Sequence, residues 1–137
     1  MKLSALKINS AALEQGRWVG DIPEMGQVRL RVRGLGNSDY RALMDRLIDS
    51  VPREERIRGL SPAKQDECVA ICLRDTVLVD WDGFQNEDGT PMPFDKEMAG
   101  QMLLDPDFQR FNRAVQWAAN VVAIESEVDT KDAVGKR

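Results

Sequence analysis

The sequence predicts an α+β fold, in which an amino-terminal β-hairpin or small antiparallel sheet packs on a mainly helical part of about four helices. Two short strand-like runs, 17–22 and 27–35, lie on either side of a turn-forming segment. From residue 37 onward, apolar residues recur at spacings of three and four, which is typical of amphipathic helices. Helix-start signals, among them a Ser-Pro and an Asp-Pro pair, divide that part into separate helices.

The 137-residue chain has the length of a single domain and can bury a substantial core. We expect one globular domain over residues 1–126, with the hairpin at 14–36 and the helical part at 37–126, followed by a disordered polar tail at 127–137. No run approaches the ~20 apolar residues of a membrane helix, and the amino terminus lacks the apolar segment of a signal peptide. The sequence therefore predicts a cytoplasmic protein without a membrane partner.

The first two expected strands form a hairpin, because Pro23-Glu24-Met25-Gly26 between them has the composition of a turn. The second strand alternates apolar and basic side chains: Val28, Leu30 and Val32 against Arg29, Arg31 and Arg33. One face of this strand is therefore apolar, and the other carries three guanidinium groups. These arginines are candidates for binding nucleic acid or an acidic partner. The alternative is that they form the solvated face of a small sheet.

Two helices are expected between residues 37 and 79. Asn37 or Ser38 caps the first, whose apolar residues form one stripe, and Val51-Pro52 ends it. A polar link follows at 53–59. The second helix begins at Ser61-Pro62, where a capping serine precedes a proline at the first helical position, and should reach about Val79.

The chain contains no histidine and only two cysteines, Cys68 and Cys72. Without histidine it lacks the commonest general base, the commonest metal ligand and the base of the usual nucleophile pairs. The cysteines lie four residues apart on one helix face, and further ligands for zinc would have to be carboxylates. We therefore expect two buried thiols in a reduced environment, no metal or cofactor, no catalytic residue and no enzyme activity.

Residues 80–93 are rich in Asp, Asn, Gly and Pro and are expected to form a long loop. Its apolar residues either fold back onto the core as a lid, or they leave Trp81 or Phe84 as an exposed anchor for a partner. Trp81, Phe84 and the adjacent Phe94 are therefore candidate partner-binding residues. The acidic run does not fit a calcium loop, because the position five residues before Gly89 is Phe84 and not a carboxylate.

Two further helices complete the chain. Asp95 caps a short helix to Leu104, and Asp105-Pro106 begins the last helix after a sharp turn. The last helix carries a wide apolar arc that includes Trp117. Such an arc suits a helix packed on two neighbours, or one packed on its own domain and on another chain. Trp117 is therefore another candidate partner-binding residue, and a homo-oligomer is an open alternative.

An ordered set of motifs in the second half of the chain resembles the tail assembly chaperones of long-tailed lambdoid phages. The set is Trp81, Glu87-Asp88-Gly89, Pro93-Phe94 and Leu103-Leu104-Asp105-Pro106 before an amphipathic helix. The resemblance implies a non-catalytic helper in the host cytoplasm, which binds the tape measure protein during tail assembly and is absent from the finished particle.

The resemblance extends upstream through Gly16-Arg17-Trp18-Val19 and Asn37-Ser38-Asp39-Tyr40. It also implies a programmed −1 frameshift near the end of the gene. The shift adds a carboxy-terminal extension that recruits the tail tube protein, and Val134-Gly135-Lys136 can be encoded by a slippery sequence.

The charge of the chain is uneven. Residues 1–66 hold 12 basic and 9 acidic residues, whereas residues 67–137 hold 7 and 14. Because the acidic second half repels phosphate backbones, we expect no nucleic-acid partner. The leading hypothesis is a chaperone that covers the unburied apolar faces of tape measure helices. Two alternatives are a small regulatory nucleic-acid-binding protein that uses the Arg-rich strand, and an acidic inhibitor or interaction module.

Overall fold

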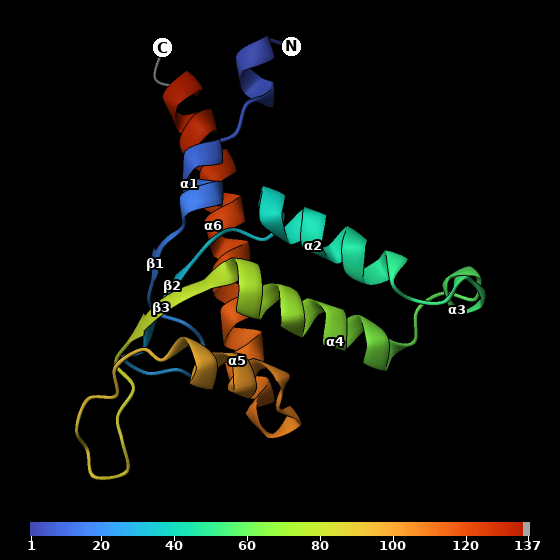
Figure 1. Ribbon diagram of the computed structural model, residues 1–137. Helices are drawn as coiled ribbons and strands as arrows, with labels where there is room; N and C mark the ends of the chain where they lie inside the picture. Colours follow the sequence, from blue (N-terminus) through green and yellow to red (C-terminus); the bar gives the residue numbers. More distant parts are fainter. Residues whose placement is uncertain (136–137) are drawn as a thin grey trace.

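The computed structural model describes the backbone of residues 1–135 and the side chains of residues 1–126. Within that part, six α-helices and a three-stranded antiparallel sheet form the molecule (Figure 1). The predicted α+β class is confirmed. The helices are more numerous than the four expected, because short helices also form before the first strand and inside the polar link.

The sheet contains β1 (Arg17–Val19), β2 (Arg29–Val32) and β3 (Leu78–Asp82), in the spatial order β1-β2-β3. The predicted hairpin is confirmed, since β1 pairs with β2 in the antiparallel sense. The third strand is a correction, because the sequence predicted a helix to Val79 and a loop from Asp80. Two aspartates lower the strand propensity of this segment, but Leu78 and Trp81 bury their side chains once β2 offers the segment a free edge.

The helix that begins at Ser61-Pro62 is shorter than predicted. α4 (Pro62–Cys72) continues as a π-helical segment, η2 (Leu73–Val77), which leads into β3 without an intervening loop. Inside η2 the hydroxyl of Thr76 donates a hydrogen bond to the carbonyl of Cys72 at 2.7 Å. A side chain that bonds to the carbonyl four residues earlier competes with regular helical bonding, which fits the change of conformation here.

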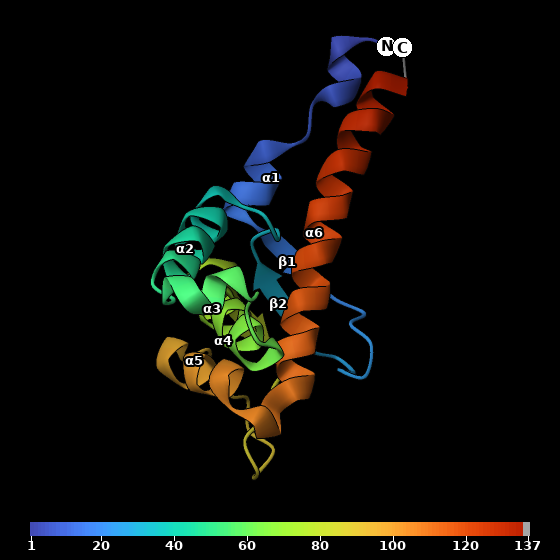
Figure 2. The same ribbon diagram turned by 90° about the vertical axis from the view of Figure 1, so that its right-hand side faces the viewer.

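The first sixteen residues form structure that the sequence analysis did not predict. A 3-10 turn, η1 (Leu3–Leu6), precedes α1 (Ser10–Gln15), so residues 14 and 15 belong to a helix and not to the hairpin. Both elements lie along the distal half of the last helix (Figures 1 and 2). The Asn9 amide donates to the Ser126 carbonyl at 3.0 Å, which fixes the start of α1 to that helix.

Helices α2 (Ser38–Asp49) and α4 lie side by side and are joined at their outer ends by α3 (Arg53–Ile57) (Figure 1). We call residues 38–72 the arm. The predicted start and end of α2 are confirmed, and Asn37 is its cap. α3 replaces the expected polar link. Its first turn contains Glu54 and Glu55, and acidic residues are favourable at the positive end of a helix.

The chain ends in α5 (Lys96–Leu104), the 3-10 turn η3 (Pro106–Phe108) and α6 (Gln109–Gly135). The predicted Asp95 and Asp105 caps are confirmed. α6 continues as a helix to Gly135, whereas the sequence predicted a disordered polar tail from residue 127. No glycine or proline interrupts the sequence between Gln109 and Gly135, so no helix-stop signal occurs earlier. Residues 136 and 137 of that tail lie outside the described residues.

The core lies between the inner face of the sheet and α6, which crosses that face (Figure 2). Leu30 and Val32 of β2 have no exposed surface. α6 contributes an almost continuous stripe of buried residues, namely Phe111, Ala114, Val115, Ala118, Ala119 and Val122. α6 is therefore the helix around which the sheet, α5 and the root of the arm are organised.

Candidate functional site

Trp81, a predicted partner anchor, lies in the core, where its side chain is 4% exposed. Its ring makes edge-to-face contacts with those of Phe84, Phe94 and Phe111, at centroid distances of 5.0, 5.1 and 6.0 Å. Its indole N–H donates to the carbonyl of Met92 at 3.1 Å. The hypothesis that Trp81 is an exposed anchor is therefore wrong, and the lid interpretation describes its position.

The loop between β3 and α5 folds back on itself and on the core. Phe84 and Phe94 are half-buried and pack against the core. The Met92 amide donates to the Phe84 carbonyl at 2.9 Å, and nearer the tip the Asn86 amide donates to the Thr90 carbonyl at 2.8 Å. The tip projects from the body (Figure 1). The loop therefore presents mainly its polar tip to solvent, while its aromatic residues close the lower end of the core.

The outward-facing side of the sheet carries two of the three candidate arginines. The Arg29 guanidinium forms an ion pair with Asp82 at 2.8 Å and lies 5.3 Å from the ring centroid of Trp18. Arg31 is exposed and stands opposite Trp18 on one side and Asp80 on the other. The solvated-face alternative therefore describes Arg29 and Arg31. The sequence analysis did not select Trp18, which is 40% exposed, although its alternation with buried Val19 places it beside these arginines.

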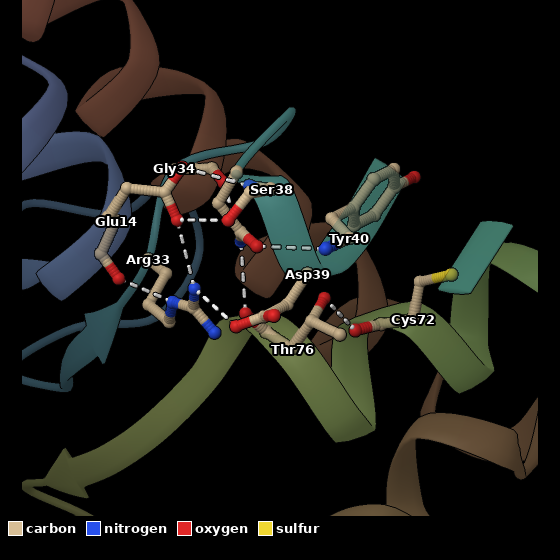
Figure 3. A network of polar contacts seen from close by, with 9 residues as sticks. Glu14, Arg33, Gly34, Ser38, Asp39, Tyr40, Cys72 and Thr76 are labelled. Atoms are coloured by element: carbon tan, nitrogen blue, oxygen red, sulfur yellow. Dashed lines mark hydrogen bonds and ion pairs between the residues drawn. The ribbon is translucent and has the colours of Figure 1, made fainter. Parts of the chain in front are cut away.

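Arg33 does not belong to this exposed face, so the prediction of a single row of three arginines is wrong. It follows the end of β2, and its half-buried guanidinium forms ion pairs with Glu14 at 3.2 Å and with Asp39 at 2.8 Å (Figure 3). Glu14 belongs to α1 and Asp39 to α2. Arg33 therefore connects these two helices to the end of β2, which is a structural role.

Glu14 lies at the centre of this polar network (Figure 3). Its carboxylate accepts hydrogen bonds from the Ser38 amide at 2.9 Å and from the Ser38 hydroxyl at 2.8 Å. These bonds, the Ser38 amide first, and the nearby Arg33 guanidinium hold the pKa of Glu14 below its ordinary value, although partial burial acts in the opposite direction. A carboxylate at this place also complements the positive end of α2.

The lowered pKa of Glu14 predicts that its contribution to stability depends on pH. A carboxyl group whose pKa is lower in the folded state stabilises the fold fully above the unfolded-state value of about 4.3, and the contribution disappears as the pH falls through the folded-state pKa. Urea unfolding of the wild type and of Glu14→Gln should therefore differ most at pH 7 and converge in acid. A difference that stayed constant down to pH 2 would contradict this assignment.

Asn37 is fully buried where β2, η2 and α2 meet. Its side-chain amide donates to the carbonyls of Gly34 and Thr76, both at 3.0 Å, and its side-chain oxygen accepts from the Tyr40 amide at 2.8 Å. One side chain thereby satisfies two buried carbonyls and caps a helix. This junction sets the position of the arm relative to the sheet.

The arm is held together by a thin apolar layer. The predicted apolar stripe of α2 exists, but each of its residues is only half-buried; they are Tyr40, Leu43, Met44, Leu47 and Ile48. Cys68 and Cys72 of α4 are buried and free, which confirms the predicted buried thiols. Burial raises the pKa of the Cys72 thiol to about 11, and the neighbouring Cys68 contributes a smaller part of this increase. The thiol is therefore protonated at neutral pH, which is the unreactive form.

A groove of about 480 Å³ lies between α4, the corner that joins α5 to α6, and the first turns of α6. Its lining from α4 is Ala63, Asp66, Glu67, Val69 and Ala70. Its lining from the corner and α6 is Leu103, Leu104, Asp105, Pro106, Gln109, Asn112, Arg113 and Gln116. The corner is fixed from within, because the Asn112 side chain donates to the Leu103 carbonyl at 3.1 Å.

One exposed apolar side chain lines the groove, and two more are close in sequence to lining residues. Leu104 lines it and is 42% exposed, and Phe108, 43% exposed, follows the lining residue Pro106 by two positions. Trp117 is 39% exposed and stands one helical turn after the lining residue Arg113. Trp117 is thus the one aromatic candidate that the structure leaves substantially exposed beside a concave surface. Leu104, Phe108 and Arg113 were missed, because the groove arises only when α4 packs near the corner.

Among the described residues, no helix combines the length and the apolar character needed to cross a bilayer. In the same part of the chain, no three cysteine or acidic side chains are grouped so that they could hold a metal ion.

The chain was also compared with known proteins. A sequence model of the family described as YdaY prophage protein matches residues 35–136, which is 102 of the 137 residues. No curated protein and no solved structure matches the chain. The matched segment contains the whole arm, the loop after β3, and every residue that lines the groove. The chain therefore belongs to the YdaY prophage protein family and is of phage origin.

Proposed function

We propose that this prophage protein is a tail assembly chaperone, which binds the tape measure protein in the host cytoplasm and keeps it soluble until the tail tube polymerises around it. The family match supports a phage protein, and the motifs from Trp81 to Pro106 supply the resemblance to tail assembly chaperones. The groove is the observation that carries the proposal. One of those motifs, Leu103-Leu104-Asp105-Pro106, forms its lip.

The chemistry of the groove suits an amphipathic helix. Apolar side chains from α4 and the corner, such as Val69 and Leu104, lie among the charged side chains of Glu67 and Arg113. A bound helix could place its apolar face on the apolar side chains and its polar flanks beside Glu67 and Arg113. A tape measure protein is a very long helical chain whose apolar faces are unburied before the tube forms, and such faces aggregate.

The mixed lining also suits reversible binding. Polar groups lose water on association and regain only part of that energy in new hydrogen bonds, so the net affinity of such a site is modest. Many copies along one tape measure chain could keep it soluble together. Each copy would still be released when the tube protein competes for the same helix.

The proposal includes a longer, frameshifted product that recruits the tail tube protein. α6 carries the chain away from the groove, so an extension after residue 137 would leave the groove open (Figure 1). The relevant codons are those of Val134, Gly135 and Lys136, and Lys136 lies outside the described residues. Mass spectrometry of the products of the natural gene tests this part. A single product of 15.4 kDa would remove it.

The nucleic-acid alternative gains no support from the arginines. Arg29 is engaged by Asp82, and Arg33 by Glu14 and Asp39. Phosphates approaching Arg31 would also meet the carboxylates of β3, which repel them.

Co-expression with the tape measure protein of the same prophage tests the chaperone function. The wild-type chain should raise the soluble fraction of the tape measure protein and co-purify with it. Leu104→Asp and Arg113→Glu change exposed residues of the groove, so each should lower the co-purified amount at least several-fold. Ile57→Asp and Arg110→Glu are matched controls on exposed positions outside the groove, and they should behave like the wild type.

Two outcomes of this experiment would count against the proposal in different ways. If the wild-type chain neither retains nor solubilises the tape measure protein, the chaperone function is wrong. If binding occurs but the groove variants and their controls retain equal amounts, the function stands and the groove is not the binding site.

A further inference from the structure

The sheet has an outer face that no element of the described residues covers. It consists of Trp18, Arg29, Arg31, Val79, Asp80 and Asp82. α6 lies against the opposite face (Figure 2). A register shift between Arg31 and Val32 leaves Val79 as an extra residue in β3, so Val79 is exposed beside Asp80, which is half-buried and accepts a hydrogen bond from the Trp81 amide at 2.8 Å. An exposed tryptophan and valine therefore accompany the charged residues of this face.

The charges on the outer sheet face are separated by strand. β2 contributes the basic residues Arg29 and Arg31, and β3 contributes Asp82 and Asp80 directly opposite them. Arg29 and Asp82 already form an ion pair. Arg31 has no ion-pair partner among the residues that the structure describes. The face thus presents a basic column and an acidic column of equal length, side by side.

We propose that the outer sheet face is a contact surface between two copies of this chain. A two-fold axis parallel to the strands, placed between β2 and β3, lays β2 of each copy over β3 of the other. Because Arg31 and Asp80 are cross-strand partners, this axis brings Arg31 over Asp80 of the second copy. The same operation brings Arg29 over Asp82 of the second copy. The basic column of each copy therefore faces the acidic column of the other.

The hydrophobic residues fit the same arrangement. β1 lies on the side of β2 away from β3, so Trp18 extends beyond the paired columns and reaches the second copy's β3, where Val79 is exposed. Tryptophan and arginine are the residues that most often contribute strongly to protein contacts. A face of three short strands is small, so the association should be weak, and it should weaken further with salt because Arg29, Arg31 and Asp82 are exposed.

A second copy fits this face better than a polyanion does. A phosphate backbone would gain from Arg31 but would meet two carboxylates on the adjacent strand. None of the residues that line the groove belongs to the outer sheet face, so the contact neither requires nor blocks the proposed chaperone site.

Sedimentation equilibrium of the purified full chain at high micromolar concentration and low salt tests this inference. We expect a species of twice the 15.4 kDa chain mass, which dissociates in high salt. Arg31→Glu and Asp80→Lys should each weaken association at least tenfold, since each places like charges together at both contacts. An equimolar mixture of the two variants should restore the dimer, because every contact then joins opposite charges. Arg41→Glu, at an exposed position of α2, is the control and should leave association unchanged.

The inference is overturned if the wild type is monomeric at this concentration, or if Arg31→Glu remains dimeric. It is also overturned if correctly folded Arg31→Glu and Asp80→Lys fail to associate with each other when mixed. Melting temperatures check the fold, and Trp18→Ser replaces Asp80→Lys as the second monomeric variant if the latter is unfolded. Tight binding of an RNA or DNA oligonucleotide by a monomer, lost in Arg31→Glu, would assign the face to nucleic acid instead.

Discussion

Replacing Trp81 with alanine is expected to destabilise the protein by about 3–5 kcal/mol, the usual cost of truncating a buried aromatic residue. Trp81 is 4% exposed and contacts three phenylalanine rings, and its indole also satisfies the Met92 carbonyl. Because a domain has a total stability of about 5–15 kcal/mol, this variant should unfold at a much lower urea concentration. The measurement is urea unfolding followed by far-ultraviolet circular dichroism.

Trp18→Ala is the matched control for this experiment. Trp18 is 40% exposed and its main ring contact is the Arg29 guanidinium, so its replacement should cost about 1 kcal/mol or less. Equal unfolding midpoints for Trp81→Ala and the wild type would show that the aromatic cluster does not hold the loop onto the core.

The burial of Trp81 also restricts which variants are suitable for binding studies. Loss of partner binding in Trp81→Ala would report unfolding, so contacts must be mapped with exposed residues.

Replacing Asn37 with alanine is expected to cost about 3 kcal/mol. The change leaves the buried carbonyl of Thr76 without this donor, at roughly 1–3 kcal/mol for a buried group that loses its partner, while the Gly34 carbonyl keeps the Asn37 backbone amide at 3.2 Å. It also removes the cap of α2, which typically contributes about 1 kcal/mol. Thermal and urea unfolding measure the sum. Asn37→Asp separates the parts, because it keeps the capping oxygen but places a carboxylate against the two carbonyls.

Ser61→Ala provides the comparison for the Asn37 variant. Ser61 also caps a helix, through a bond from the Lys64 amide to its hydroxyl at 3.2 Å, but it is exposed. Its replacement should cost about 1 kcal/mol, because water can satisfy the freed amide. If the two alanine variants lose the same stability, the buried bonds of Asn37 contribute nothing beyond a cap, and the junction does not fix the arm.

The predictable parts of this fold are those whose causes are local in sequence. The caps at Asn37, Ser61, Asp95 and Asp105 were predicted correctly, since a capping side chain bonds to amides only two or three residues away. Alternation along β2 likewise identified its buried face. α3 was missed, although Pro52 followed by two glutamates after Arg53 is itself a local helix-start signal.

The parts that failed depend on residues distant in sequence. β3 is a strand because β2, almost fifty residues earlier, offers it an edge. Trp81 is buried because Phe94 and Phe111 come from other elements to surround it. Arg33 leaves the exposed face because Glu14 and Asp39 lie within reach. The candidate site shows the same limit: Trp117 was named from its helix alone, while the groove beside it requires α4 and the corner together.

The continuous passage from α4 through η2 into β3 has a thermodynamic consequence. Residues 62–82 form one uninterrupted run, with the α4 wall of the groove at one end and the acidic column of the outer sheet face at the other. If a partner helix shifted α4 when it bound in the groove, it would also displace Asp80 and Asp82. Partner binding and self-association would then obey reciprocal linkage: the factor by which a bound helix changes the dimer dissociation constant equals the factor by which dimer formation changes the affinity for that helix.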